Sequence, residues 1–130
     1  MEIGRWRDRI TRAKQMGLDL RLLPFDCDRG EFAYSHTILN LDDRGVYACI
    51  EELNQLPVPE NFTSFTGKQP NYDDRCYGPT TDTPYGERLT YTTAGELCSI
   101  PLERRSEYWR PTWAYLEALP PETKIALFWH

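Results

Sequence analysis

The stretch that decides the fold is RPTWAYLEALPPETKIALFWH, residues 110–130. Pro111 suits the first position of a helix, because the N–H that proline lacks would have no intrahelical partner there. Apolar side chains then recur at helical spacing, at Trp113, Leu116 and Leu119. Residues at this spacing form one apolar stripe along a helix. We therefore expect a helix over 111–119.

A strand should follow this helix, because Pro120 and Pro121 cannot continue it. Both faces of the strand are apolar, with Ile125, Leu127 and Trp129 on one face and Ala126 and Phe128 on the other. A strand that is apolar on both faces usually lies in the interior of a sheet. We expect an interior strand at 124–129, within a single α+β domain over residues 1–130.

The rest of the chain predicts a small mixed β-sheet covered by about four helices. Apolar spacing is strongest over 44–56, where Asp42 or Asp43 is expected to cap the helix. Thr93 and Glu96 have the spacing of a capping box. Pro24 is expected to end an edge strand. The expected helices are 2–16, 44–56, 93–99 and 111–119, and the expected strands are 18–23, 31–41, 61–66, 88–92 and 124–129.

The charge of the chain bears on its partners. The net charge is −5 and the sequence pI is about 5.0. Residues 1–17 carry five basic and two acidic side chains, so this segment has a charge of +3 and the remainder −8. An acidic body does not favour binding to nucleic acid phosphates. We expect the basic segment to pack on the acidic body. The alternative is that it forms a helix that binds nucleic acid or a partner.

No membrane segment or secretion signal is visible, so we expect a cytoplasmic protein. We expect a monomer or a small homo-oligomer. The four cysteines are scattered and form no Cys-x-x-Cys pair; they are Cys27, Cys49, Cys76 and Cys98. Free thiols are the simplest interpretation in a reducing compartment. A zinc site would lack the close ligand pairs that such sites usually have, so we expect no metal and no cofactor.

Residues 57–88 are unusual for their length and their content of Pro, Gly and aromatic side chains. A loop this long in a compact domain is usually functional, disordered, or the sign of a missed element. Disordered segments are poor in aromatic residues, so we expect an ordered loop. Its aromatics either pin the loop to the body or bind a partner protein, as in paratopes. The candidate partner-binding residues are Phe65, Tyr72, Asp73, Asp74, Tyr77 and Tyr85.

Motifs of common enzymes are absent: there is no Gly-x-Gly-x-x-Gly, Walker loop, Gly-x-Ser-x-Gly or His-Glu-x-x-His. The sequence therefore favours no catalytic residue. The alternative is a small enzyme or ligand-binding domain that uses His36, Asp73 and Asp74, with His130 as a further candidate. Such a site would require these groups to meet around one ligand atom.

Two segments of the C-terminal half resemble sequences of a known family. YGERLTYTTAGEL at 85–97 and WAYLEALPPETKIALFWH at 113–130 resemble a family of small uncharacterised proteins encoded by phages and prophages. That family tends to carry a Tyr-Gly-x-x-Leu-Thr segment, an Ala-Gly-Glu-Leu helix start and a closing Leu-Pro-Pro-x-Thr strand that ends in Trp-His. The resemblance covers about the last third of the chain and supplies no catalytic residues.

The resemblance implies a viral origin, a location in the bacterial host cytoplasm and a non-structural, accessory role. By analogy with other small acidic phage proteins, it implies binding to a host bacterial protein, with inhibition of a defence or regulatory system as one form. The expected function is therefore protein binding by a phage or prophage accessory protein, and no membrane partner is expected.

Overall fold

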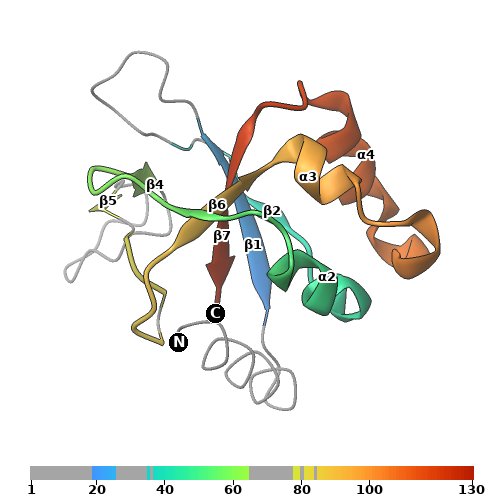
Figure 1. Cartoon of the computed structure of the whole chain (residues 1–130), viewed down its shortest axis with the longest axis horizontal. Coiled ribbons are helices and arrows are strands. Elements are labelled where there is room, and N and C mark those ends of the chain that lie inside the picture. The colour runs from blue at the N-terminus through green and yellow to red at the C-terminus, as the bar shows by residue number, and fades with distance from the viewer. Residues whose placement is uncertain (1–18, 26–34, 36, 65–77, 80, 84) are drawn as a thin grey trace.

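The computed structural model describes residues 19–25, 35, 37–64, 78–79, 81–83 and 85–130. Within these residues, five strands form a sheet in the order β2-β1-β7-β6-β3 (Figure 1). The strands are β1 Leu20–Phe25, β2 Leu39–Asn40, β3 Leu56–Pro57, β6 Thr90–Thr93 and β7 Lys124–Trp129. A separate two-stranded sheet pairs β4 Thr63–Ser64 with β5 Gly78–Pro79.

The helices of the described chain are short. The α-helices are α2 Tyr47–Glu51, α3 Ala94–Cys98 and α4 Arg110–Ala118. The 3-10 turns are η1 Arg44–Val46, η2 Leu102–Arg104 and η3 Glu107–Trp109. These elements confirm a small α+β fold with three α-helices in the described part of the chain, and the expected helix 2–16 lies outside that part.

The prediction for β7 is confirmed, because this strand lies in the middle of the sheet. It pairs with β1 on one side and with β6 on the other, and every residue from Ile125 to Trp129 is buried. Side chains of β7 enter two different cores. Ile125, Leu127 and Trp129 join one core, and Ala126 and Phe128 join the other.

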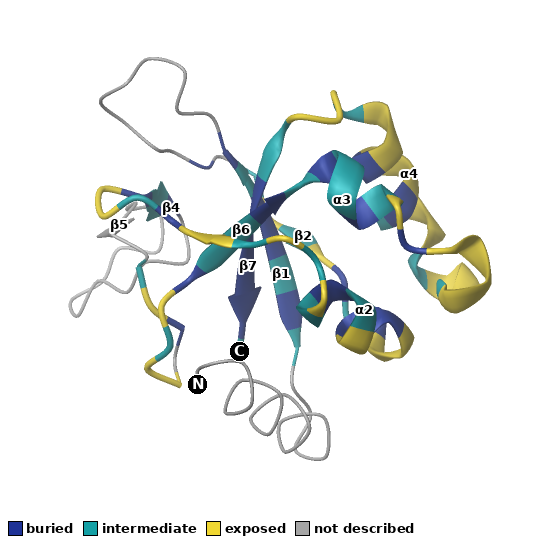
Figure 2. Ribbon diagram, in the orientation of Figure 1, coloured by how far each residue is buried: buried dark blue, intermediate teal, exposed yellow. Residues whose placement is uncertain are grey.

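The larger core lies between the sheet and the three helices, which all cover the same face (Figures 1 and 2). Each helix contributes its apolar stripe, as the spacing of these residues predicts. The helical members include Tyr47, Ile50, Leu97, Trp113 and Leu116. The smaller core lies on the opposite face of the sheet and is made by Leu23, Phe25, Val58, Phe62, Leu89, Ala126 and Phe128.

The expectation of a mixed sheet is wrong for the described strands, because every pairing in the sheet is antiparallel. The reason lies in the path between β6 and β7. Thr93 at the end of β6 is paired with Lys124 at the start of β7, so the chain leaves and re-enters the sheet at the same end. Backbone bonds from Ala94 N to Thr123 O and from Gly95 N to Pro121 O close this helical excursion at 2.9 Å each.

Pro24 does not end β1, contrary to expectation, because the strand continues to Phe25. Asp19 and His130 exchange two backbone hydrogen bonds of 2.9 Å, and the alternation of an antiparallel ladder then turns the nitrogen of Pro24 away from β7. On that side β2 pairs only with Arg21 and Leu22. Proline is tolerated there because no ladder bond is lost.

The predicted helix 44–56 is too long at its C-terminal end. α2 ends at Glu51, and Leu56 pairs with Tyr91 as part of β3 rather than facing the core. Gln55 makes the change of direction possible: its amide nitrogen donates to the carbonyl oxygen of Ile50, and its amide oxygen accepts from Thr90 Oγ1. Pairing with β6 thus overrides the helical spacing.

Capping was predicted correctly for one helix and wrongly for another. The side chain of Thr93 accepts a hydrogen bond from Glu96 N and so caps α3 as expected. Neither Asp42 nor Asp43 caps the helix that follows it. Asp42 instead accepts a hydrogen bond from Leu20 N at 2.8 Å. Asp43 accepts hydrogen bonds from Ser106 N and Trp113 Nε1, which are far along the chain.

Two predicted strands are found only in part. Of the segment 31–41, the described strand is Leu39–Asn40, and of the segment 61–66 it is Thr63–Ser64. The remaining described members of these segments are not in strands, and 31–34, 36 and 65–66 lie outside the described residues. The described parts of 57–88 hold β4, β5 and a bridge between Asp82 and Arg88, so they contain more regular structure than a single loop.

Candidate functional site

One of the six predicted partner-binding residues, Tyr85, is described. The others, together with the catalytic candidate His36, lie outside the described residues: Phe65, Tyr72, Asp73, Asp74 and Tyr77. The arrangement of this predicted surface, and of the alternative site with His36, Asp73 and Asp74, therefore stays a prediction.

Tyr85 lies near the tip of a tight turn between Thr81 and Leu89. Thr83 organises the turn, because its buried Oγ1 accepts from Tyr85 N at 3.2 Å and from Glu87 N at 3.3 Å. Gly86 has a φ of 84°, a left-handed conformation that glycine adopts at little cost. Tyr85 is 42% exposed, and its role in binding a partner stays a prediction.

His130, the further catalytic candidate, is half-buried at the end of β7. Its ring lies 5.7 Å from that of Phe128, centroid to centroid. Burial lowers the pKa of His130 below its ordinary value of 6.5, and the nearby charge of Arg21 lowers it further. A histidine in this position is mainly neutral at neutral pH.

A different surface stands out among the described residues, formed by residues 101–117 of η2, η3 and α4. We refer to it as the 101–117 surface. Its apolar side chains Leu102 and Tyr108 are 72% and 80% exposed, the largest values among the exposed large hydrophobic residues of the described chain. Figure 2 shows η2 and much of α4 as exposed ribbon at the edge of the molecule that lies away from β4 and β5. Exposed apolar side chains in a group can mark an interaction site.

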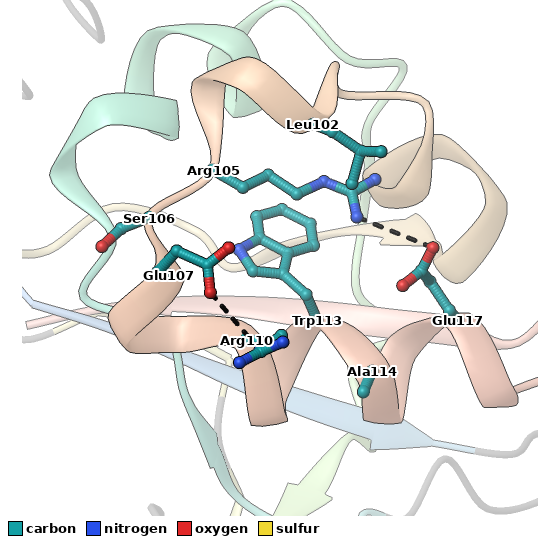
Figure 3. Close-up of a pocket in the computed structure, with 8 residues that line it drawn as sticks. All are labelled: Leu102, Arg105, Ser106, Glu107, Arg110, Trp113, Ala114 and Glu117. Carbon is teal, nitrogen blue, oxygen red and sulfur yellow. Dashed lines mark ion pairs between the residues drawn. The ribbon is translucent and has the colours of Figure 1, made fainter.

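A hollow of about 340 Å³ lies in the 101–117 surface. We call it the α4 hollow (Figure 3). It is lined by Leu102, Arg105, Ser106, Glu107, Arg110, Trp113, Ala114 and Glu117. This volume is at the lower end of the range for small-ligand pockets and is large enough for one or two side chains of a partner.

Arg105 and Trp113 form the rigid part of this hollow. The side chain of Arg105 is 7% exposed, and its Cζ lies 4.4 Å from the centroid of the Trp113 indole. This distance is within the range of a cation–π interaction. Arg105 Nε donates to Ile100 O at 3.1 Å, and Nη2 donates to Cys98 O at 2.8 Å. These bonds fix the guanidinium against the C-terminal end of α3.

Asp43 stabilises the hollow by hydrogen bonds to two of the residues that line it. This buried carboxylate accepts a hydrogen bond from Ser106 N at 2.8 Å and another from Trp113 Nε1 at 3.2 Å, both to Oδ2. One side chain before α2 thus fixes the start of η3 and the indole of α4. The hollow is therefore preformed by contacts between residues that are distant in sequence.

Two ion pairs border the α4 hollow and differ in their exposure (Figure 3). Arg105 Nη1 lies 3.7 Å from Glu117 Oε2, and the Glu117 side chain is 53% exposed. Arg110 Nε lies 3.4 Å from Glu107 Oε2, and both of these side chains are well exposed. The second pair is worth little to stability because water screens it.

Cys98 lies at the end of α3, next to this region. Burial raises the pKa of its thiol, and the charge of Arg105 opposes this effect. A raised pKa keeps the thiol protonated near neutral pH, and a thiol is a poor nucleophile. Among the described residues, no group of three His, Cys, Asp or Glu side chains is placed to hold a metal ion. None of the described helices has the length and apolar character to cross a membrane.

The sequence did not predict the 101–117 surface, because the contacts that hold it join residues that are distant in the chain. One signal was available. Trp109 and Trp113 are one helical turn apart, and both contact the larger core, as their spacing predicts. Arginines beside such a pair of tryptophans indicate stacking, which is often found where a surface binds a partner.

Comparison of the chain with family models, curated proteins and solved structures gave no match.

Proposed function

We propose that the protein acts by binding another protein through the 101–117 surface. The observation that carries this proposal is the combination of two highly exposed apolar side chains, Leu102 and Tyr108, with the preformed α4 hollow between η2, η3 and α4. Exposure of these side chains to water is unfavourable, and contact with a partner would remove that cost.

The composition of the surface supports a protein partner. Trp, Tyr and Arg are the residue types that most often contribute strongly to protein–protein binding. Here Tyr108 is exposed, whereas Trp113 and Arg105 are held in place by hydrogen bonds before any partner arrives. A rigid surface loses little conformational entropy when it binds, so more of the contact energy appears as affinity.

The resemblance to phage and prophage accessory proteins suggests the class of partner. We propose a host bacterial protein, such as a component of a defence or regulatory system, and inhibition as the consequence of binding. The predicted surface of 57–88, with Tyr72, Asp73 and Asp74, is a second candidate for the contact. The two surfaces can be separated by substitution.

The proposal is tested by capture of partners from bacterial lysate on the tagged protein. The test variant combines Leu102→Ser with Tyr108→Ser. A matched control combines Ile38→Ser with Leu56→Ser, because these side chains are also exposed, at 39% and 60%, and neither belongs to the 101–117 surface. We expect one stoichiometric protein on the wild type and on the control, and its loss on the test variant. Equal capture by both variants would refute the proposed surface.

A further inference from the structure

We propose that the α4 hollow is a carboxylate-binding site, in which Arg105 receives an Asp or Glu side chain of the partner protein in place of Glu117. This inference rests on the proposed function and specifies the chemistry of the partner. It follows from the hydrogen bonding of Arg105, from the burial of its side chain and from the position of Glu117.

The hydrogen bonds of Arg105 leave one nitrogen unused. Nε and Nη2 form one edge of the planar guanidinium, and this edge is filled by the carbonyl oxygens of Ile100 and Cys98. Nη1 is shielded from water and has no hydrogen-bond partner among the described residues. A role in tying η2 to α3 therefore explains two nitrogens of Arg105 and leaves the third without a function.

An unused donor on a buried cation is costly. Loss of water from a charged group without a replacement hydrogen bond costs more than about 1 kcal/mol. The nearest anion, Glu117 Oε2, lies 3.7 Å from Nη1, which is beyond hydrogen-bond distance. Because Glu117 is half exposed, water competes with Arg105 for its carboxylate. The free protein thus holds a cation that is incompletely neutralised.

A carboxylate from a partner would satisfy this nitrogen. Hydrogen bonds between guanidinium and carboxylate are shorter, at about 2.7–2.9 Å, and stronger than neutral ones. Trp113 supports the guanidinium plane from one side, so the donor does not need to reorganise. Since Nη1 is shielded from water, the incoming group has to displace a neighbouring side chain. Glu117 is the candidate, because its carboxylate lies 3.7 Å from Nη1 and its side chain is 53% exposed, so water can solvate it after displacement.

The other features of the hollow favour an acidic side chain over other ligands. Glu107 would repel a phosphate more strongly than a carboxylate, because a phosphate carries more negative charge. A cation bound to these two glutamates would form exposed pairs worth less than about 1 kcal/mol. The exposed Leu102 at the rim is suited to contact the methylene groups of Glu or an apolar neighbour in the partner.

The test uses two small probes that differ only in charge, N-acetyl-Leu-Glu-amide and N-acetyl-Leu-Gln-amide. Binding is followed by NMR through the Nε–H signal of Arg105 and the indole N–H signal of Trp113. We expect the Glu probe to shift both signals in a saturable manner and the Gln probe to leave them unchanged. Equal shifts with both probes, or none with either, would overturn the carboxylate site.

Glu117→Ala provides a second test that does not depend on altering Arg105. This variant removes the competing carboxylate and keeps a residue with high helix propensity, so the fold should persist. We expect it to bind the Glu probe about five- to tenfold more tightly, the gain from an uncontested charge-assisted hydrogen bond. Glu107→Ala is the matched control. It removes the same charge from the rim, but Glu107 is paired with Arg110 and not with Arg105. An equal gain in both variants would show that only general repulsion was relieved and would contradict the displacement of Glu117.

Failure of this inference can be told apart from failure of the proposed function. If Leu102→Ser with Tyr108→Ser abolishes capture of a partner while the Glu probe shifts no signal, the surface binds a protein but the carboxylate site is wrong. If the Glu probe binds and the same double variant still captures its partner, the hollow binds a carboxylate, but the protein-binding role of the 101–117 surface is refuted and a side chain of the partner is refuted as the source of that carboxylate.

Discussion

The 101–117 surface and the turn around Tyr85 both present exposed aromatic side chains, but they are held in different ways. The tip of the turn is held by bonds between Thr83 and the backbone of residues 85–87, and its end is tied to the body by the bond from Arg88 Nη2 to Val58 O. The 101–117 surface is held by side chains distant in sequence, because Asp43 bonds to Ser106 and Trp113. We therefore expect the tip of the turn to change shape more independently of the core than the 101–117 surface does.

Among the substitutions that separate these two regions, Asp43→Ala should lower the stability of the protein most. The substitution leaves the buried indole N–H of Trp113 and the N–H of Ser106 without their acceptor. We expect the free energy of unfolding to fall by about 3 kcal/mol, the cost of two unsatisfied donors. Chemical denaturation would measure this loss. Asp43→Asn keeps an acceptor oxygen and should cost less; an equal loss in both variants would contradict the role given to these two bonds.

A smaller and more local effect is expected from Thr83→Val. Valine has nearly the same shape but cannot accept from Tyr85 N and Glu87 N. We expect a loss of about 1 kcal/mol and faster amide hydrogen exchange at residues 85–87, with unchanged exchange at residues 106–113. Thr83→Ser keeps the hydroxyl and serves as the control. Faster exchange in both regions would show that the turn and the 101–117 surface are not independent.

The smallest effect on the free energy of unfolding should come from a change of pH. The Tyr85 turn and the 101–117 surface should both feel it, because His130 follows the central strand β7 of the shared sheet. Burial and Arg21 lower the folded pKa of His130, while Asp19 and Asp42 oppose them. The unfolded chain therefore binds a proton more readily, so stability should fall as the pH drops through 6.5 and level off below the folded pKa. Denaturation at several pH values would measure this slope. His130→Gln should remove it, and an unchanged slope in this variant would assign it to another group.

The sequence predicted the elements whose form depends on neighbours along the chain. The spacing of Trp113 and Leu116, the double apolar face of 124–129 and the Thr93 cap all appear in the structure as expected. These features follow from local periodicity and local hydrogen bonding, which can be read without knowledge of the fold.

The sequence predicted poorly the features that depend on distant partners. Leu56 has the spacing of a buried helical residue, yet it pairs with Tyr91 in β3. Asp43 has the position of a cap, yet it binds Ser106 and Trp113. The α4 hollow was missed for the same reason, since Arg105 acquires its role only when α3 and α4 meet. Such contacts are set by the fold and not by spacing.

The proposal that the 101–117 surface binds a protein is tested most directly by comparing two variants in one capture experiment from bacterial lysate. One variant carries Leu102→Ser and Tyr108→Ser, and the other carries Tyr72→Ala, Asp73→Ala and Asp74→Ala. We expect the first variant to lose the stoichiometric partner and the second to retain most of it. Loss of the partner in the second variant, with full capture by the first, would contradict the proposal and place the contact in the 57–88 region.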